Sequence, residues 1–281
     1  MKYSKDSEQL LEILFSHQSK INFNNNSKLT NKILINFYND IKKSDNKINK
    51  LFKNSKIKKV FMEKNIYPDL FKNSNDFLPI NIKNIIENRS VGTIKYTTIL
   101  NKVKIKENIL IFNKKTENMI RADKMFKMSL KWLDVILNYI NHEQKEINIF
   151  LYLTSVKKTK KTDSKPLDCE NVNTAVTYAC QKEAEILIYR YEEWFKVLMH
   201  ETMHALCLDF SISKNEGLNS LMKNIKKLFP VESNFELYEA YSEIWATLLN
   251  ICFVSYMNLY DKDEKNYLLY TNFNLNMEKK F

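Results

Sequence analysis

Glycine is almost missing from this chain of 281 residues and occurs only at Gly92 and Gly217. Loops that cradle phosphate groups, and the fingerprint loops of dinucleotide-binding folds, need several glycines close together so that the backbone can approach the ligand. Two isolated glycines cannot build such a loop. The sequence therefore excludes nucleotide sites of both kinds.

Long apolar runs are missing as well. No segment approaches the roughly 20 apolar residues of a membrane span, and residues 1–20 are amphipathic and mixed in charge, unlike a secretory signal. The hydrophobic content of 44% is nevertheless sufficient to bury a sizeable core in one large domain or two small ones. We therefore expect a cytoplasmic globular protein without a membrane partner.

Cysteine is scarce, and its spacing matches neither a metal-binding motif nor a disulfide framework. The four cysteines are Cys169, Cys180, Cys207 and Cys252. We predict that all four are reduced and that most of them lie in or near the core.

Acidic residues are outnumbered: 44 Lys and Arg stand against 33 Asp and Glu, which gives a formal net charge of +11. Clustered basic side chains release counterions from nucleic-acid phosphates, so a basic nucleic-acid-associated protein is one alternative. However, Asn, Lys, Ile, Phe and Tyr are all abundant, which is typical of a very AT-rich genome. The basic run at residues 157–161 is typical of a solvated loop. We therefore do not expect a nucleic-acid partner.

Histidine is rare too, yet two of the four histidines form the motif His200-Glu201-Thr202-Met203-His204. On a helix, side chains at i and i+4 lie on one face, so both imidazoles can reach one zinc ion. The glutamate between them is then beside the metal, where it can take a proton from a water molecule whose pKa zinc lowers to near 7. The motif predicts one zinc ion held by His200 and His204, with Glu201 as the catalytic base of peptide hydrolysis.

The pattern of the chain predicts a helical N-terminal subdomain at residues 1–89 and a second domain at residues 90–281. Residues 93–100 and 104–112 are predicted strands of a hairpin, joined by a turn at Asn101 and Lys102. A long helix with an apolar stripe follows at residues 116–141. Two further strands are expected at residues 147–154 and 184–191, and the second leads into the helix that carries the motif.

A catalytic zinc needs a third protein ligand. The metzincin extension of the motif would require glycine at position 207 and histidine or aspartate at position 210, where this chain has Cys207 and Phe210. A predicted helix at residues 235–257 instead places three glutamates on one face. They are Glu236, Glu239 and Glu243. Acidic side chains among apolar neighbours are costly unless a cation compensates them.

The run Glu239-Ala240-Tyr241-Ser242-Glu243-Ile244 resembles the Glu-Ala-x-Ser-Asp-Ile segment of the gluzincins, the thermolysin-like zinc peptidases. The resemblance implies that Glu239 is the third ligand and that Glu243 orients His200. Two departures are that Glu243 is longer than the family aspartate and that residues 205–238 form a longer connection than in thermolysin. Glu236 stays open as a substitute ligand.

The order of elements over residues 93–209 also resembles the N-terminal half of zincin peptidases. It implies an α+β fold whose zincin-like region contains a small twisted mixed sheet, a backing helix and the motif helix, with helical N-terminal and C-terminal parts. The partner would be a peptide or protein substrate. In zincins an edge strand holds the substrate, so we expect substrate contacts from Asn171 and Asn173.

Zinc-bound histidines donate their other ring nitrogen to a carboxylate or carbonyl, and Asp209 is placed to serve His204 in this way. No single residue stands out as the donor that stabilises the oxyanion. The candidates are Tyr238, Tyr241, Tyr256 and His142.

Two further interpretations stay open. Only residues 258–281 follow the ligand helix, whereas gluzincins usually continue with a helical subdomain that closes the cleft, so a catalytically inactive zinc-binding protein acting as a binding module is an alternative. The segment from Asn171 through the motif also resembles uncharacterised HExxH proteins of large eukaryotic DNA viruses. That resemblance implies a viral protein of the host cytoplasm or the virion.

Overall fold

The computed structural model describes residues 28–54, 56–73, 76–159, 167–210, 216–229 and 235–278. By their mutual contacts the residues group into two units, Asp40–Asn250 and a smaller one formed by Met1–Asn39 with Ile251–Phe281. The domains predicted from the sequence, residues 1–89 and 90–281, do not coincide with these units, and that division stays a prediction.

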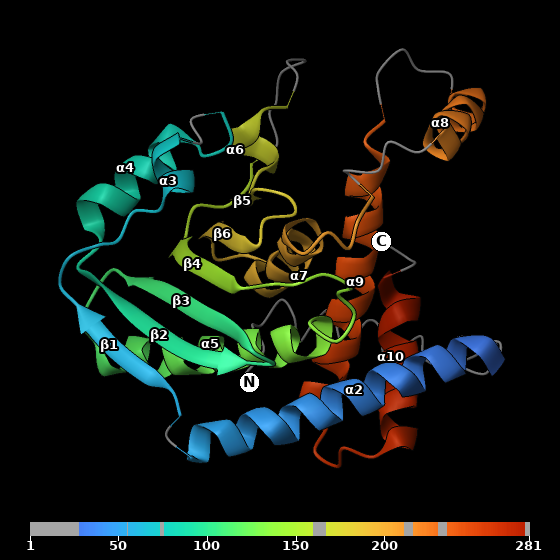
Figure 1. The fold of residues 1–281 in the computed structure, drawn as a ribbon, viewed down its shortest axis with the longest axis horizontal. Helices are drawn as coiled ribbons and strands as arrows, with labels where there is room; N and C mark the ends of the chain where they lie inside the picture. The colour runs from blue at the N-terminus through green and yellow to red at the C-terminus, as the bar shows by residue number, and fades with distance from the viewer. Residues whose placement is uncertain are drawn as a thin grey trace. The chain divides into compact units, whose positions relative to one another are not determined.

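The larger unit contains a six-stranded mixed sheet in the order β1-β2-β3-β4-β6-β5 (Figure 1). The strands are β1 (Lys58–Met62), β2 (Gly92–Leu100), β3 (Val103–Ile111), β4 (Glu146–Thr154), β5 (Ala175–Thr177) and β6 (Glu183–Arg190). Strands β3, β4 and β6 are parallel, whereas β1 and β5 pair antiparallel with their neighbours at the two edges. With its helices, this sheet confirms the predicted α+β class.

The predicted hairpin is confirmed. Strands β2 and β3 pair antiparallel up to Leu100 and Val103, and the two residues between them have positive φ angles of 50° at Asn101 and 69° at Lys102. Left-handed backbone at both central positions gives a two-residue turn the twist that the flanking strands need. Asn is among the few non-glycine residues that adopt it readily.

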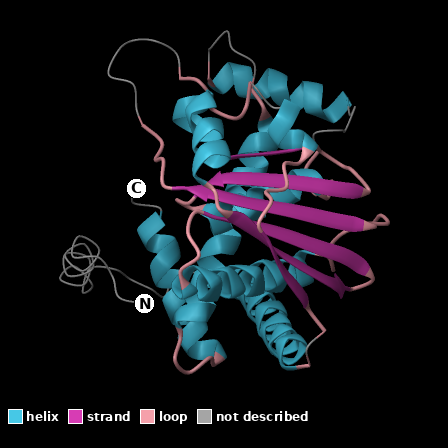
Figure 2. Cartoon of the chain, turned by 90° about the vertical axis from the view of Figure 1, so that its left-hand side faces the viewer, coloured by secondary structure: helices cyan, strands magenta, loops and turns pink. Residues whose placement is uncertain are grey.

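Helices cover both faces of the sheet (Figure 2). Helices α5 (Thr116–Ile136) and α7 (Trp194–Ala205) lie on one face, where α5 contacts β2 and β3 and α7 contacts β5 and β6. Helices α3 (Asp69–Asn73) and α4 (Ile80–Arg89) lie on the other, over a buried cluster that includes Phe150 and Tyr189. The helix expected at residues 116–141 ends at Ile136, where the Asn138 amide donates a hydrogen bond of 2.8 Å to the carbonyl of Asp134.

Two strands depart from the sequence-based expectation. Strand β1 lies in the segment predicted to be helical; it is an exposed edge strand, so it shows no apolar alternation. Strand β5 has only three residues, too few to show a periodic pattern in the sequence, and it is defined by its pairing with β6. Residues 1–27, also predicted to be helical, lie outside the described part of the chain.

Two long helices each contribute residues to both units: α2 (Lys28–Lys53) and α9 (Leu237–Asn258). The smaller unit also contains α10 (Glu264–Glu278), and in it the Tyr38 hydroxyl donates a hydrogen bond of 2.7 Å to the carbonyl of Lys262. The helical C-terminal part is thus confirmed. No helix in the described residues combines the length and apolar content that crossing a bilayer requires.

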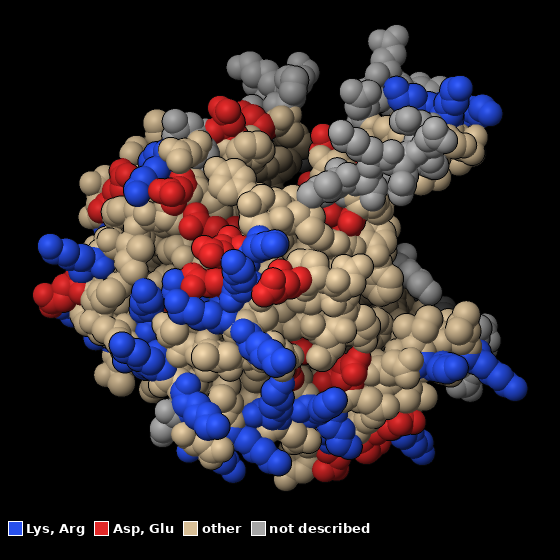
Figure 3. All heavy atoms as spheres, in the orientation of Figure 1, with Lys and Arg blue, Asp and Glu red and all other residues tan. Residues whose placement is uncertain are grey.

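Basic side chains do not form a surface of one sign on the face drawn in Figure 3, where Lys and Arg gather in its lower part with Asp and Glu beside and between them. On the sheet, Glu146 pairs with Lys104 at 3.1 Å and also with Lys106. Basic side chains on this sheet therefore have acidic neighbours and do not form a patch of one sign.

Candidate metal centre

The predicted motif helix is confirmed as α7, which follows β6 closely in the chain. Its buried side chains include Leu198 and Met199, whereas both histidines point to the opposite side, into a cleft. The Nε2 atoms of His200 and His204 lie 3.1 Å apart. Helical spacing therefore brings the two imidazoles to one point, as the sequence predicts.

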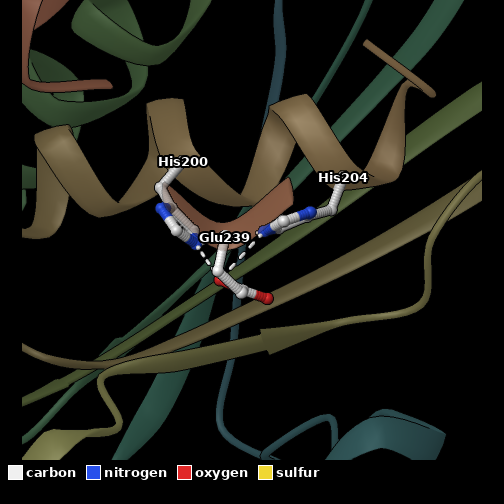
Figure 4. Close-up of side chains that lie close together, drawn as sticks. All are labelled: His200, His204 and Glu239. Carbon is white, nitrogen blue, oxygen red and sulfur yellow. Dashed lines mark hydrogen bonds and ion pairs between the residues drawn. The ribbon is translucent and has the colours of Figure 1, made fainter. Parts of the chain in front are cut away.

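A glutamate from the first turn of α9 completes a triangle with the histidines (Figure 4). The Oε2 atom of Glu239 lies 3.2 Å from Nε2 of His200 and 3.5 Å from Nε2 of His204. Among the described residues, His200, His204 and Glu239 form a group of three potential ligands that could hold a metal ion. Glu236 lies outside the group and accepts a hydrogen bond of 2.9 Å from the Tyr238 hydroxyl.

Both histidines have a carboxylate at the other ring nitrogen. Nδ1 of His204 lies 2.5 Å from Oδ2 of Asp209, and Nδ1 of His200 lies 3.2 Å from Oε2 of Glu243. The second carboxylate is itself held by Lys196, whose Nζ lies 2.8 Å from Oε1 of Glu243. Only the contact of His204 with Asp209 is a hydrogen bond, since the buried Nδ1 of His200 makes none within the described residues. The carboxylate of Asp209 favours the tautomer of His204 with its proton at Nδ1, so that Nε2 offers its lone pair to a metal.

The negative charges of the cluster favour a cation. Hydrogen bonds to the two histidines lower the pKa of Glu239 to about 2, and His200 has the same effect on the pKa of Glu243. Burial alone would lower the pKa of His200, but Glu239 and Glu243 outweigh it and raise that pKa to about 9. The pKa of His204 rises to about 10 against its burial, because of Asp209 and Glu239. The field that binds protons on the imidazoles would also attract a metal ion.

Glu201 faces the same cleft from α7 and is buried. Burial raises its pKa to about 7, although the nearby His200 and His204 act in the opposite direction. A carboxyl group with a pKa near neutrality is well suited to accept and return a proton.

The cleft has a volume of about 860 Å³ and is bounded by α7, the first turn of α9, the segment around β5 and the α3–α4 region. Strand β5 pairs with β6 along one edge only, so its other edge is open within the described residues. Leu70 and Phe77, from the N-terminal part of the chain, also line the cleft. The sequence did not predict this, because nothing near these two residues marks them as part of a binding site.

The two predicted substrate-binding asparagines differ in position. Asn173 lines the cleft, and its amide donates a hydrogen bond of 3.3 Å to the carbonyl of Phe77. Asn171 does not line it; its side chain accepts a hydrogen bond from the Asp168 N–H at the start of α6 (Cys169–Val172) and donates one of 2.7 Å to the carbonyl of Thr159. Substrate contacts from both residues stay predictions.

Arg190 is a structural residue of the cleft that the sequence analysis missed. It is buried, and its guanidinium donates hydrogen bonds to the carbonyls of Asn173 at 2.9 Å, Val156 at 3.2 Å and Glu170 at 2.6 Å. These bonds fix the backbone that leads into β5. A charged residue at the end of an apolar strand was the available signal.

Of the four candidate oxyanion donors, Tyr238 is the one that lines the cleft, with its ring edge-on to His204 at a centroid distance of 6.1 Å. Tyr241 packs against Phe210 at 5.3 Å instead. His142 is not part of the cleft lining, and Tyr256 belongs to the smaller unit.

The prediction of four reduced cysteines is wrong for two of them. Cys180 and Cys207 form a disulfide bond with Cα atoms 4.8 Å apart, while Cys169 and Cys252 are free. The 27 residues of sequence separation gave no sign that the fold brings the pair together.

Comparison of the chain with protein-family models, curated proteins and solved structures finds no match in any of the three. A function must therefore be argued from the geometry and chemistry of the site.

Proposed function

We propose that this protein is a zinc-dependent peptidase in which Glu201 activates the attacking water. The observation that carries the proposal is the triangle of ligand atoms from His200, His204 and Glu239, with separations of 3.1, 3.2 and 3.5 Å. Zinc bonds of 2.0–2.1 Å in tetrahedral geometry place ligand atoms about 3.3 Å apart. The three atoms therefore fit three corners of a zinc tetrahedron.

The kind of ligands also favours zinc. Two imidazoles and one carboxylate form a set that catalytic zinc sites use, and three protein ligands leave one position for water or substrate. A structural zinc would have four protein ligands. The carboxylate of Asp209 at the outer ring nitrogen of His204 supplies the support that zinc histidines usually have, and the carboxylate of Glu243 lies 3.2 Å from the outer nitrogen of His200.

The residues of the chain divide the work of hydrolysis. Zinc, when bound, would supply the Lewis acid that acidifies a water molecule and polarises the substrate carbonyl. Glu201 accepts the proton as the water attacks and returns it to the leaving amine. In the metal-free chain burial raises the pKa of Glu201 to about 7, and this carboxyl group borders the cleft that contains the ligand triangle.

The open edge of β5 is the natural place for the substrate. An extended peptide can add to such an edge through main-chain hydrogen bonds. Because β5 and α7 both border the cleft, a peptide bound along this edge would pass beside the ligand cluster. Helix α5 contacts α7 and the same face of the sheet, and the proposal takes it as the backing helix of a zincin-like region.

A comparison of the wild type with Glu201→Gln tests the proposal. We expect the zinc-loaded wild type to cleave peptides in a fluorogenic library and the variant to lose about 10²–10⁴-fold in rate, with unchanged zinc content. The exposed Glu117 on α5 provides a matched control, since Glu117→Gln should keep full activity. A wild type that binds zinc and is as inactive as Glu201→Gln would favour the binding-module alternative.

A further inference from the structure

A covalent bond joins the end of the motif helix to the wall of the cleft. Cys207 follows His204 by three residues, and Cys180 follows Thr177, the last residue of β5, by three residues. The cleft lining includes His204 on one side of the bond and Ala179 on the other. The disulfide therefore links the segment that carries a proposed zinc ligand to the segment that would bind the substrate.

Backbone hydrogen bonds centre on the same place. The carbonyl of His204 accepts the N–H of Cys180 at 3.1 Å and the N–H of Cys207 at 3.2 Å. The N–H of Leu208 donates to the carbonyl of Met203 at 2.9 Å. The last two bonds form the usual closing motif of a helix, and the first attaches the loop of Cys180 directly to the ligand residue.

Both cysteines hold a backbone conformation that favours glycine. Their φ angles are 57° at Cys180 and 53° at Cys207, and Cys207 occupies the position after the cap where helices commonly have glycine. Left-handed backbone is strained for a residue with a side chain. The turn at Cys207 leads the chain back so that Asp209 reaches His204. A bond that fixes this turn also fixes the carboxylate that orients the imidazole.

We propose that the Cys180–Cys207 disulfide can be reversibly reduced, and that its redox state sets how tightly the His200–His204–Glu239 group holds zinc. The proposal rests on zinc binding at this site, as argued above. Both cysteines are partly exposed, so a small dithiol can reach the bond. The other two cysteines are free and offer internal controls.

The chemistry is thiol–disulfide exchange with a dithiol reductant. One reductant thiolate attacks a sulfur of the pair, the S–S bond breaks, and the electron pair leaves with the other cysteine sulfur. The second reductant thiol then displaces the mixed disulfide. The protein gains two electrons and two protons, and the reductant becomes a cyclic disulfide. The turn at Cys207 is then held by hydrogen bonds alone, so Asp209 orients His204 less firmly.

The experiment compares the oxidised chain with the dithiothreitol-treated chain after anaerobic removal of the reductant. Alkylation and mass spectrometry should find two free thiols before treatment and four after it, in accord with the two free cysteines of the structure. Competition with a chromophoric chelator should show about tenfold weaker zinc binding after reduction, the size of effect expected when a ligand loses its orienting partner.

Four variants separate the bond from other effects. Cys169→Ser should respond to dithiothreitol as the wild type does. The double variant Cys180→Ser, Cys207→Ser should show the weakened affinity with or without the reductant, which excludes zinc capture by the freed thiols as the cause. Cys207→Gly should bind zinc more tightly than Cys207→Ser, because glycine adopts the left-handed turn without strain.

Equal zinc affinity of the oxidised and reduced chains would overturn this inference while leaving the zinc site intact. Four free thiols in the untreated chain would overturn it as well. Absence of zinc from both forms would overturn the proposed function, and the inference with it.

Discussion

The indole Nε1 of Trp132 on α5 donates a hydrogen bond of 2.8 Å to Oγ1 of Thr202, the residue at the centre of the His-Glu-Thr-Met-His motif. Both side chains are fully buried, and the Thr202 hydroxyl donates in turn to the carbonyl of Met199 at 2.8 Å. Helix α5 is thereby joined to the turn of α7 that lies between the two histidines.

The substitution Thr202→Val should destabilise the protein by about 1–3 kcal/mol, because it keeps the shape of the side chain but removes the oxygen that accepts the hydrogen bond of the buried indole N–H. Urea unfolding of the metal-free chain measures the change. In the Trp132→Phe background the same substitution should cost less, since no donor remains to be orphaned. Equal costs in both backgrounds would mean that the bond contributes nothing.

The contact between Asp209 and His204 should control metal affinity. We expect Asp209→Ala to weaken zinc binding by about 10–100-fold, since the imidazole loses the carboxylate that holds its orientation and tautomer. Asp209→Asn should weaken it less, because the amide oxygen can still accept the Nδ1 proton. Isothermal titration with zinc measures both effects.

The exposed carboxylate of Asp69 is the control for this series, as it lies outside the metal group and its side chain is 80% exposed. Asp69→Asn should bind zinc as the wild type does. An Asp209→Ala variant with the same affinity would show that Asp209 does not support the site.

Because of Glu107, we expect the free energy of unfolding to depend on pH in an unusual way. This residue is fully buried on β3, and neither carboxylate oxygen has a hydrogen-bond partner among the described residues. Burial raises its pKa from 4.5 to about 8, although the nearby Ser129 acts in the opposite direction. Between these two values the folded chain binds the proton that the unfolded chain has lost. The stability that the protonated Glu107 contributes to the folded chain is therefore fully present below pH 4.5, and it is lost as the pH rises to about 8.

The variant Glu107→Gln removes this titration. Its free energy of unfolding, relative to the wild type, should rise by about 2–3 kcal/mol between pH 5.5 and pH 8.5. Urea unfolding at the two pH values measures the difference, with the exposed Glu117→Gln as a control that should show no such trend. A constant difference between Glu107→Gln and the wild type would mean that Glu107 is ionised in the folded chain throughout.

Local sequence was sufficient for elements that carry their own signal. The alternation in β2 and β3 and the turn at Asn101 and Lys102 predicted the hairpin, and the spacing of His200 and His204 predicted a helix that presents both imidazoles on one side. These features depend on neighbours within a few residues, so no tertiary information was needed.

Features set by distant contacts were not predictable in the same way. The sequence places Glu236 and Glu239 on one face of a predicted helix, whereas in the structure Glu236 precedes α9 and Glu239 lies in its first turn. The position of α9 relative to α7 decides which of them meets the histidines. The Cys180–Cys207 bond likewise depends on the loop after β5 returning to the end of α7. The three residues of β5 gain their strand conformation from β6 rather than from their own sequence.

The most direct test of the account is metal analysis of the purified wild type beside Glu239→Ala and Glu236→Ala. We expect about one zinc ion per chain in the wild type and in Glu236→Ala, and strongly reduced zinc in Glu239→Ala, because the proposed site has only three protein ligands. Full zinc content in Glu239→Ala, or its loss in Glu236→Ala, would contradict the assignment of His200, His204 and Glu239 as the metal ligands.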